Sequence, residues 1–362
     1  MKNENLSIDK AKIMLFLGAG ASAAFGYPTT KRFVKNLQGS LSNTRELILL
    51  NNLLQIKDIT DVEQILFLIE SVKQLKETPM IDLLKTYSSS IQFNNLPSNI
   101  IEQFPIWDNL EQRIYDEIFK QYEFNLETKE EVNNTYLSLL NIIKKYNSDE
   151  YINIFTTNYD KVIEEICHED ACQFNYDDGF KYHEIRRQEE WYGSLSDKLN
   201  INKDIIKLFK LHGSLDWRKK SDGKIVKVGS EERINKSRRF RENILIYPSK
   251  KIQREDQPYK WLHDTFIEQL KTTNIMIVIG FSFRDEYINE ILNKYYKGNV
   301  ILISPNASKN FGINLDKKRS DYSEKIHDII DSEYKNDPAL MKHIEDSIKG
   351  EIAVLRKLSK NI

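Results

Sequence analysis

The stretch IMLFLGAGASAAFGYPTTKRF, from Ile13 to Phe33, decides the fold class. It starts with a short apolar run, passes through Gly18, Ala19 and Gly20, and leads into a segment that we interpret as a helix. A buried strand that ends in a glycine turn before a helix is typical of nucleotide-binding α/β domains. The glycines let a phosphate approach the backbone, and the helix offers free N–H groups. The stretch therefore predicts a nucleotide cradle.

The glycine turn matches the dinucleotide fingerprint only in part. Gly18-x-Gly20-x-x-Ala23 carries alanine at its last position. No convincing acidic residue follows about 20 positions later, where a dehydrogenase would bind ribose. Residues 37–44 do not form a clear second strand. The sequence is therefore not an ordinary dehydrogenase, and a tight turn without a ligand is the alternative explanation.

Five short apolar runs predict buried strands of one sheet. A helical segment at 285–297 joins two of these runs, and such a strand–helix–strand crossover implies parallel strands. We predict an α/β fold, Rossmann-like, with a mostly parallel open sheet and helices on both faces. The runs are KIMLFLG (12–18), INIFTTN (152–158), NILIYP (243–248), NIMIVIGFS (274–282) and NVILIS (299–304).

The rest of the chain is mainly helical in pattern. Residues 37–148 have helical periodicity, few glycines and many charges, so they predict a helical insertion in an α/β domain that spans 1–310. Residues 311–362 predict a helical tail. Residues 218–242 predict a loop or small hairpin, whose basic run NKSRRFR we interpret as solvated rather than as a contact for a partner or nucleic acid.

Composition excludes several classes of protein. The net charge of −1 gives no global field that favours nucleic acid or an anionic membrane. Cys167 and Cys172 make no disulfide scaffold, and without a second close pair they predict no zinc site. No apolar run approaches the roughly 20 residues of a membrane span, and the polar N-terminus lacks a signal peptide's apolar core. We expect a cytoplasmic protein without a metal.

Polar residues follow the predicted strands, where open parallel sheets bind ligands. Asn158 ends the second run, and Asp160 either caps the next helix or belongs to the site. His212 ends an alternating apolar stretch beside the flexible Gly213, and imidazole can accept a hydroxyl proton near neutral pH. Further candidates, for which a turn or a helix cap is the alternative, are Gly280, Ser282, Ser304 and Asn306.

In this chain order the segments resemble the sirtuin-like superfamily. GAGAS with GYP is similar to the sirtuin Gly-Ala-Gly-x-Ser…Gly-x-Pro loop, and TTNYD is similar to Thr-Gln-Asn-x-Asp. LHGS resembles the segment with the catalytic histidine, GFS the Gly-Thr-Ser phosphate turn, and LISPN the late ribose-binding segment. The resemblance covers roughly residues 12–36 and 150–306.

The sequence departs from the protein deacetylases of this superfamily in two places. They carry a four-cysteine zinc ribbon, typically after the histidine segment, whereas no cysteine follows Cys172 here. Pro28-Thr29-Thr30-Lys31 stands where deacetylases have Pro-Asp-Phe-Arg. With the helical insertion, these departures resemble the bacterial defence branch, whose members cleave NAD rather than deacylate protein. They often act against phage, commonly as oligomers that are silent until triggered.

The resemblance implies an NAD+ hydrolase that releases nicotinamide and ADP-ribose, with NAD+ as substrate and no metal. It implies that Asn158 holds the nicotinamide ribose or the attacking water, and that His212 takes a proton from a ribose hydroxyl or that water. It also implies a homo-oligomer, with a separately encoded HerA-type ATPase or another phage sensor as partner. An NAD-binding regulatory subunit without turnover is the first alternative, and a deacylase or ADP-ribosyltransferase the second. The implied NAD-binding residues are Gly18, Ala19, Gly20, Ser22, Pro28, Thr157, Asp160, Gly280, Ser282, Ser304 and Asn306.

Overall fold

The chain divides into two compact units, which we describe separately. Unit 1 comprises Met1–Tyr27, Phe124–Ile246 and Ile252–Ile362, and unit 2 comprises Pro28–Glu123 and Tyr247–Lys251. The computed structural model describes residues 10–23, 25–42, 44–56, 62–76, 104–123, 129–168, 172–184, 188–193, 203–220, 222–228, 240–245, 257–305, 326–330 and 337–360.

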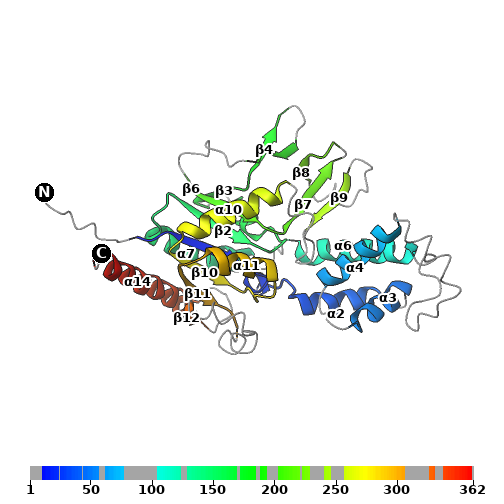
Figure 1. Ribbon diagram of the computed structural model, residues 1–362, viewed down its shortest axis with the longest axis horizontal. Coiled ribbons are helices and arrows are strands. Elements are labelled where there is room, and N and C mark those ends of the chain that lie inside the picture. Colours follow the sequence, from blue (N-terminus) through cyan, green and yellow to red (C-terminus); the bar gives the residue numbers. More distant parts are fainter. Residues whose placement is uncertain are drawn as a thin grey trace. The chain divides into compact units, whose positions relative to one another are not determined.

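Unit 1 is built on a seven-stranded sheet in the order β12-β11-β10-β1-β2-β6-β3 (Figure 1). Every neighbouring pair of strands in it is parallel. The predicted Rossmann-like parallel sheet is therefore confirmed. The strands are β1 (Ile13–Leu17), β2 (Tyr151–Thr156), β3 (Phe174–Asp177), β6 (Asp204–Lys210), β10 (Ile275–Ile279), β11 (Asn299–Ile303) and β12 (Ile326–Ile330).

Helices cover both faces of this sheet, because its central strands are apolar on both sides. On one face Phe16, Phe155 and Phe209 pack into a buried cluster with residues of α10 and α11. Side chains such as Leu15 and Ile154 alternate to the other face, and α7, α8 and α14 contact the strands of this sheet as well. The helices are α7 (Lys129–Tyr146), α8 (Val162–Cys167), α10 (Tyr259–Thr272), α11 (Glu286–Tyr295) and α14 (Pro338–Lys360).

Unit 2 contains four described helices that contact one another. For example, α3 begins where the Thr44 hydroxyl accepts the N–H of Leu47, and it buries Leu50 and Leu53. The insertion predicted over 37–148 differs from this unit, because α7 covers β2 in unit 1. The helices are α2 (Thr30–Ser40), α3 (Arg45–Leu54), α4 (Val62–Lys76) and α6 (Phe104–Tyr122). Among the described helices of either unit, none combines the length and apolar content that a membrane crossing needs.

A second sheet of unit 1 has five antiparallel strands in the order β4-β5-β8-β7-β9. It corrects the prediction that NILIYP (243–248) is a buried parallel strand. β9 contains residues 243–245 of this run and pairs antiparallel with β7, whereas residues 246–248 lie outside the described part of the chain. The strands are β4 (Phe180–His183), β5 (Gln188–Trp191), β7 (Gly213–Lys220), β8 (Ile225–Lys227) and β9 (Phe240–Leu245).

The predicted helical tail, 311–362, is corrected in part. α14 is a helix, but β12 is a strand that pairs with β11 at the edge of the parallel sheet. Its sequence IHDII is rich in β-branched residues, which favour strands. The stretch was missed because it is short and the charged tail around it has a helical pattern.

Candidate functional site

Asn158 and His212 occupy equivalent positions after neighbouring strands. Leu17, Thr156 and Lys210 are paired across β1, β2 and β6, and they mark the carboxyl ends of these strands. Asn158 follows its strand by two residues, and so does His212. Because parallel strands end at the same edge of the sheet, the structure brings the two predicted catalytic residues to that edge.

The two glycine turns pack backbone to backbone at the ends of β1 and β10. The N–H of Gly18 donates to the Ile279 carbonyl and that of Gly20 to the Gly280 carbonyl, each at 2.9 Å. A Cβ on Gly280, whose φ is +63°, would lie 2.2 Å from the Ala21 nitrogen. Close strand packing therefore requires these glycines, and the two N–H groups predicted to bind phosphate donate to carbonyl oxygens instead.

The helix after the first glycine turn is a single turn, α1 (Gly20–Ala23). Gly26 has a φ of 90° and Pro28 follows it, so the helix does not continue. The sequence predicts an anion site at this helix N-terminus. At this position the structure has one helical turn, so only its free N–H groups, and little helix dipole, are available to an anion.

Asn158 belongs to a hydrogen-bonded cluster that joins the segments after β1 and β2. Its Nδ2 donates to the Gly18 carbonyl at 3.0 Å and to Ser22 Oγ at 3.3 Å. Ser22 Oγ in turn donates to Asp160 Oδ2 at 2.8 Å. The backbone N–H of Asn158 donates to Thr156 Oγ1 at 3.0 Å. Four residues of the predicted site therefore lie in direct contact, although they come from two segments far apart in sequence.

Asp160 precedes Lys161, the N-cap residue of α8, and its carboxylate bonds both the start of this helix and Ser22. Its Oδ1 accepts the N–H of Val162 in the first turn of α8 at 3.2 Å, and its Oδ2 accepts the Ser22 hydroxyl. Burial raises the pKa of Asp160, whereas the nearby charge of Lys210 lowers it. Tyr136, buried on α7, has a raised pKa for the same reason and because Asp160 lies near it.

His212 is paired with Asp285, a residue that sequence reasoning missed. Nε2 of His212 lies 2.9 Å from Asp285 Oδ2, and both side chains are buried. Asp285 is also the N-cap of α11, since its Oδ1 accepts the N–H groups of Tyr287 and Ile288. A carboxylate that pairs with a neutral imidazole accepts its proton, so this contact favours the tautomer with the proton on Nε2 and the lone pair on Nδ1. An acid directly before an amphipathic helix was the available signal.

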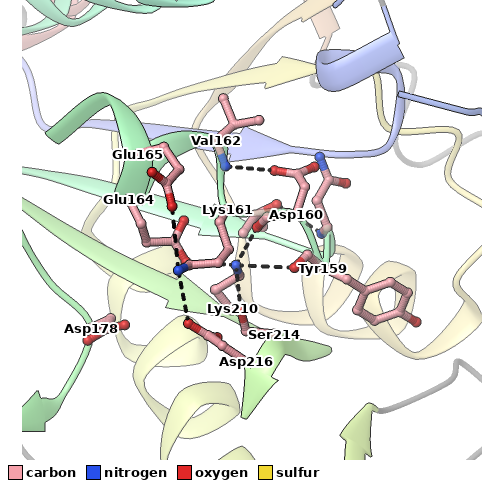
Figure 2. A network of polar contacts seen from close by, with 12 residues as sticks. Tyr159, Asp160, Lys161, Val162, Glu164, Glu165, Asp178, Lys210, Ser214 and Asp216 are labelled. Carbon is pink, nitrogen blue, oxygen red and sulfur yellow. Dashed lines mark hydrogen bonds and ion pairs between the residues drawn. The ribbon is translucent and has the colours of Figure 1, made fainter. Parts of the chain in front are cut away.

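Lys210 was also missed, because a lysine in an alternating strand usually indicates a solvent-facing position. Its side chain is only 1% exposed, and its Nζ donates to Glu164 Oε1, Ser214 Oγ and the Asp160 carbonyl (Figure 2). This ammonium therefore lies between the segments that carry Asn158 and His212.

The other predicted site residues are placed as follows. Thr157 and Ser304 directly follow β2 and β11 and are half-buried, whereas Ala19 and Ser282 are exposed in the glycine turns. Pro28 is the first residue of unit 2, and Asn306 lies outside the described residues. Within the part of the chain that the structure describes, no three His, Cys, Asp or Glu side chains are grouped as metal ligands. Cys167 and Cys172 are buried thiols, and their mutual hydrogen bond and burial raise the pKa of Cys167.

Residues 152–306 match the family model described as a SIR2-like domain. The matched segment contains Asn158, His212 and Asp285. No curated protein matches the chain. The match supports the sirtuin-like resemblance for the segment that holds the two predicted catalytic residues.

Two solved structures illustrate what the whole chain is similar to. One is the crystal structure of a Sir2 homolog–NAD complex, with 11% identity and a TM-score of 0.44 over 96% of this chain and 93% of that one. Another is Sir2 bound to an acetylated peptide, with 11% identity and a TM-score of 0.42 over 97% of this chain and 100% of that one.

Proposed function

We propose that the chain is an NAD+ glycohydrolase that releases nicotinamide and ADP-ribose. The observation that carries this proposal is the placement of Asn158 and His212 at equivalent positions after β2 and β6. Asp285 is hydrogen-bonded to the imidazole of His212. The SIR2-like family match over the same segment supports the proposal.

The sheet topology supports a dinucleotide at this edge. From β1 the order runs through β2 and β6 in one direction, and through β10, β11 and β12 in the other. Open α/β sheets bind ligands at such a switch point, outside the carboxyl ends of the strands. The turns at Gly18 and Gly280 lie at this point, and Ser22, Ala19 and Ser282 belong to or adjoin them. A nucleotide that lies across the turns would meet the exposed Ala19 and Ser282, whereas the Gly18 and Gly20 N–H groups already donate to carbonyl oxygens.

The proposed reaction breaks the bond between nicotinamide and ribose C1′. Nicotinamide leaves with the bonding electrons, an oxocarbenium-like centre forms, and water adds to C1′ and loses one proton. Asn158 holds the nicotinamide ribose or this water through its amide. His212 accepts the proton from a ribose hydroxyl or the water at Nδ1, and the Asp285 carboxylate stabilises the imidazolium that results.

The resemblance also leads us to propose a biological role. The activity would deplete NAD in antiphage defence, in a homo-oligomer that responds to a separately encoded sensor such as a HerA-type ATPase. Light scattering at micromolar protein concentration tests the oligomer, and a monomer would contradict it.

The decisive experiment measures nicotinamide release from NAD+ by the wild-type chain, alone and with the products of neighbouring genes. Asn158→Ala and His212→Ala are each expected to reduce release by about 100-fold or more, the first because the ribose or water loses its positioning amide and the second because the general base is lost. Asn134→Ala and His343→Ala are matched controls, because both residues are exposed on α7 and α14. Full turnover in both site variants would refute the assignment.

The same assay separates the alternatives. Wild-type protein whose melting temperature rises with NAD+ or ADP-ribose, but which releases no nicotinamide under any trigger, would be a binding subunit. Release that strictly requires an added acyl-lysine peptide would indicate a deacylase.

A further inference from the structure

Lys210 carries a positive charge into the interior of unit 1. An ammonium has three protons to donate. The Lys210 ammonium has Glu164 Oε1 at 2.8 Å, Ser214 Oγ at 2.9 Å and the Asp160 carbonyl as partners, and the Tyr159 carbonyl lies at 3.5 Å (Figure 2). The charge is therefore paired with one carboxylate and fully hydrogen-bonded.

These partners flank both predicted catalytic residues. Tyr159 and Asp160 directly follow Asn158 in the chain, whereas Ser214 lies two residues after His212 and Lys210 two residues before it. One ammonium thus bonds the backbone beyond Asn158 and the hydroxyl beyond His212 simultaneously. A shift of either segment breaks at least one of these bonds.

A second lysine, Lys161, extends the polar contacts around Lys210. Lys161 lies 3.5 Å from Glu165 and 3.3 Å from Asp216, so it also joins the segment after β2 to β7 (Figure 2). Although burial raises the pKa of Asp216, the charges of Lys161, Lys210 and Lys227 outweigh it and lower this pKa to about 2. Asp216 therefore stays ionised at neutral pH and balances the lysines.

Stability alone does not explain a buried lysine at this place. A buried ion pair often contributes no more stability than a well-packed apolar pair, because both charges lose their hydration. The Asp160 carbonyl and the Ser214 hydroxyl, by contrast, receive from Lys210 a directional contact that an apolar side chain does not supply.

We propose that Lys210 is a positioning residue that holds Asn158 and His212 in register for cleavage of the nicotinamide–ribose bond. It acts through the backbone at Asp160 and through Ser214, and it does not touch the substrate. This inference rests on the proposed function. The Glu164 carboxylate neutralises the buried positive charge of Lys210, which this positioning role requires.

The test compares three variants. Lys210→Met removes the three bonds and leaves Glu164 buried without its cation. The double variant Lys210→Met with Glu164→Met removes both charges and keeps the approximate volume. Lys227→Met is the matched control: it removes a second lysine whose side chain is only 11% exposed, and whose ion pairs are with Asp178 at 2.7 Å and Glu189 at 3.2 Å rather than with residues 157–163 or 211–215.

We expect Lys210→Met to lower both the melting temperature and kcat. In the double variant the melting temperature recovers toward wild type, whereas kcat stays about 10- to 100-fold low, since misplaced groups lose rate even in a folded site. KM changes by less than about 3-fold, because Lys210 does not contribute to substrate binding. Lys227→Met lowers the melting temperature and keeps the wild-type kcat.

Hydrogen–deuterium exchange separates this inference from the proposed function. Peptides that cover residues 157–163 and 211–215 exchange faster in both Lys210 variants and at the wild-type rate in Lys227→Met. Recovery of kcat together with melting temperature in the double variant would show a purely structural role and overturn the inference. So would unchanged exchange in both peptides. If wild-type protein cleaves no NAD+ at all, the proposed function fails, and the exchange result still decides whether Lys210 couples the two segments.

Discussion

Substitutions at Asp285 separate helix capping from the orientation of His212. One carboxylate oxygen accepts the N–H groups of Tyr287 and Ile288, at 3.0 and 3.1 Å, and the other lies 2.9 Å from His212 Nε2. Asp285→Ala removes all three contacts. Asp285→Asn keeps an oxygen for the cap, because asparagine and aspartate cap helices about equally well.

The two variants are expected to differ in stability. Loss of the cap costs about 1 kcal/mol, and a buried His212 nitrogen without a partner costs about 1–3 kcal/mol. Asp285→Ala therefore lowers the free energy of unfolding by about 2–4 kcal/mol. Asp285→Asn lowers it by less than about 1 kcal/mol, because the asparagine amide still bonds the imidazole.

The same variants are expected to agree in activity. In Asp285→Asn the amide N–H donates to Nε2, so the ring proton moves to Nδ1 and the lone pair of the proposed base is lost. Nicotinamide release falls by about 100-fold in both variants, as expected when a general base is disabled.

Urea unfolding measures the stabilities, and release from NAD+ at saturating substrate measures kcat. Glu286→Gln serves as the control, since Glu286 is an exposed acid one residue further along. Wild-type turnover by Asp285→Asn, with the cap intact, would refute the role assigned to the His212–Asp285 pair.

Two further predictions concern stability alone. Gly280→Ala is expected to cost at least about 2 kcal/mol, because φ is +63° and its Cβ would meet the backbone of Ala21. Gly350→Ala, in α14 with nothing within 4 Å, is expected to gain about 0.5–1 kcal/mol in urea unfolding; equal effects of the two would contradict this. Burial raises the pKa of Asp178 from 3.8 to about 6, so its charge costs stability above pH 6, and the cost disappears as pH falls toward 4. Relative to Asp178→Asn, wild type should gain about 2–3 kcal/mol in urea unfolding from pH 7 to pH 4, and a constant difference would contradict the shift.

The central strands were predictable because their physical signal is local. β1 and β10 are buried on both faces and are continuous apolar runs, and β2 and β11 are mostly apolar, with Asn153 and Asn299 as exceptions. β3 and β12 lie at the two edges of the sheet, and their sequences FNYD and IHDII are short and partly polar. β9 was assigned to the wrong sheet because an apolar pattern does not specify which strand becomes its partner.

The candidate site was predictable only where it follows a strand. Asn158 and His212 were found because polar residues directly after apolar runs are unusual. Asp285 and Lys210 were missed because their roles depend on distant partners, 73 residues away for the contact of Asp285 with His212 and 46 for that of Lys210 with Glu164. The need for glycine at Gly280 likewise comes from the backbone of Gly20 and Ala21, far away in the sequence, and not from its local sequence.

The pairing of β1 with β10 also determines when during synthesis the site can exist. Ile13 pairs with Ile275, so the first strand of the sheet and the partner beside its glycine turn lie at opposite ends of the chain. At about 5–20 residues per second, the ribosome makes β1 roughly 13–50 s before β10. A nascent chain that has passed His212 but has not reached β10 holds Asn158 and His212 but lacks the Gly280 turn and Asp285. Under the proposed function, the chain therefore cannot cleave NAD+ before its last quarter is being made.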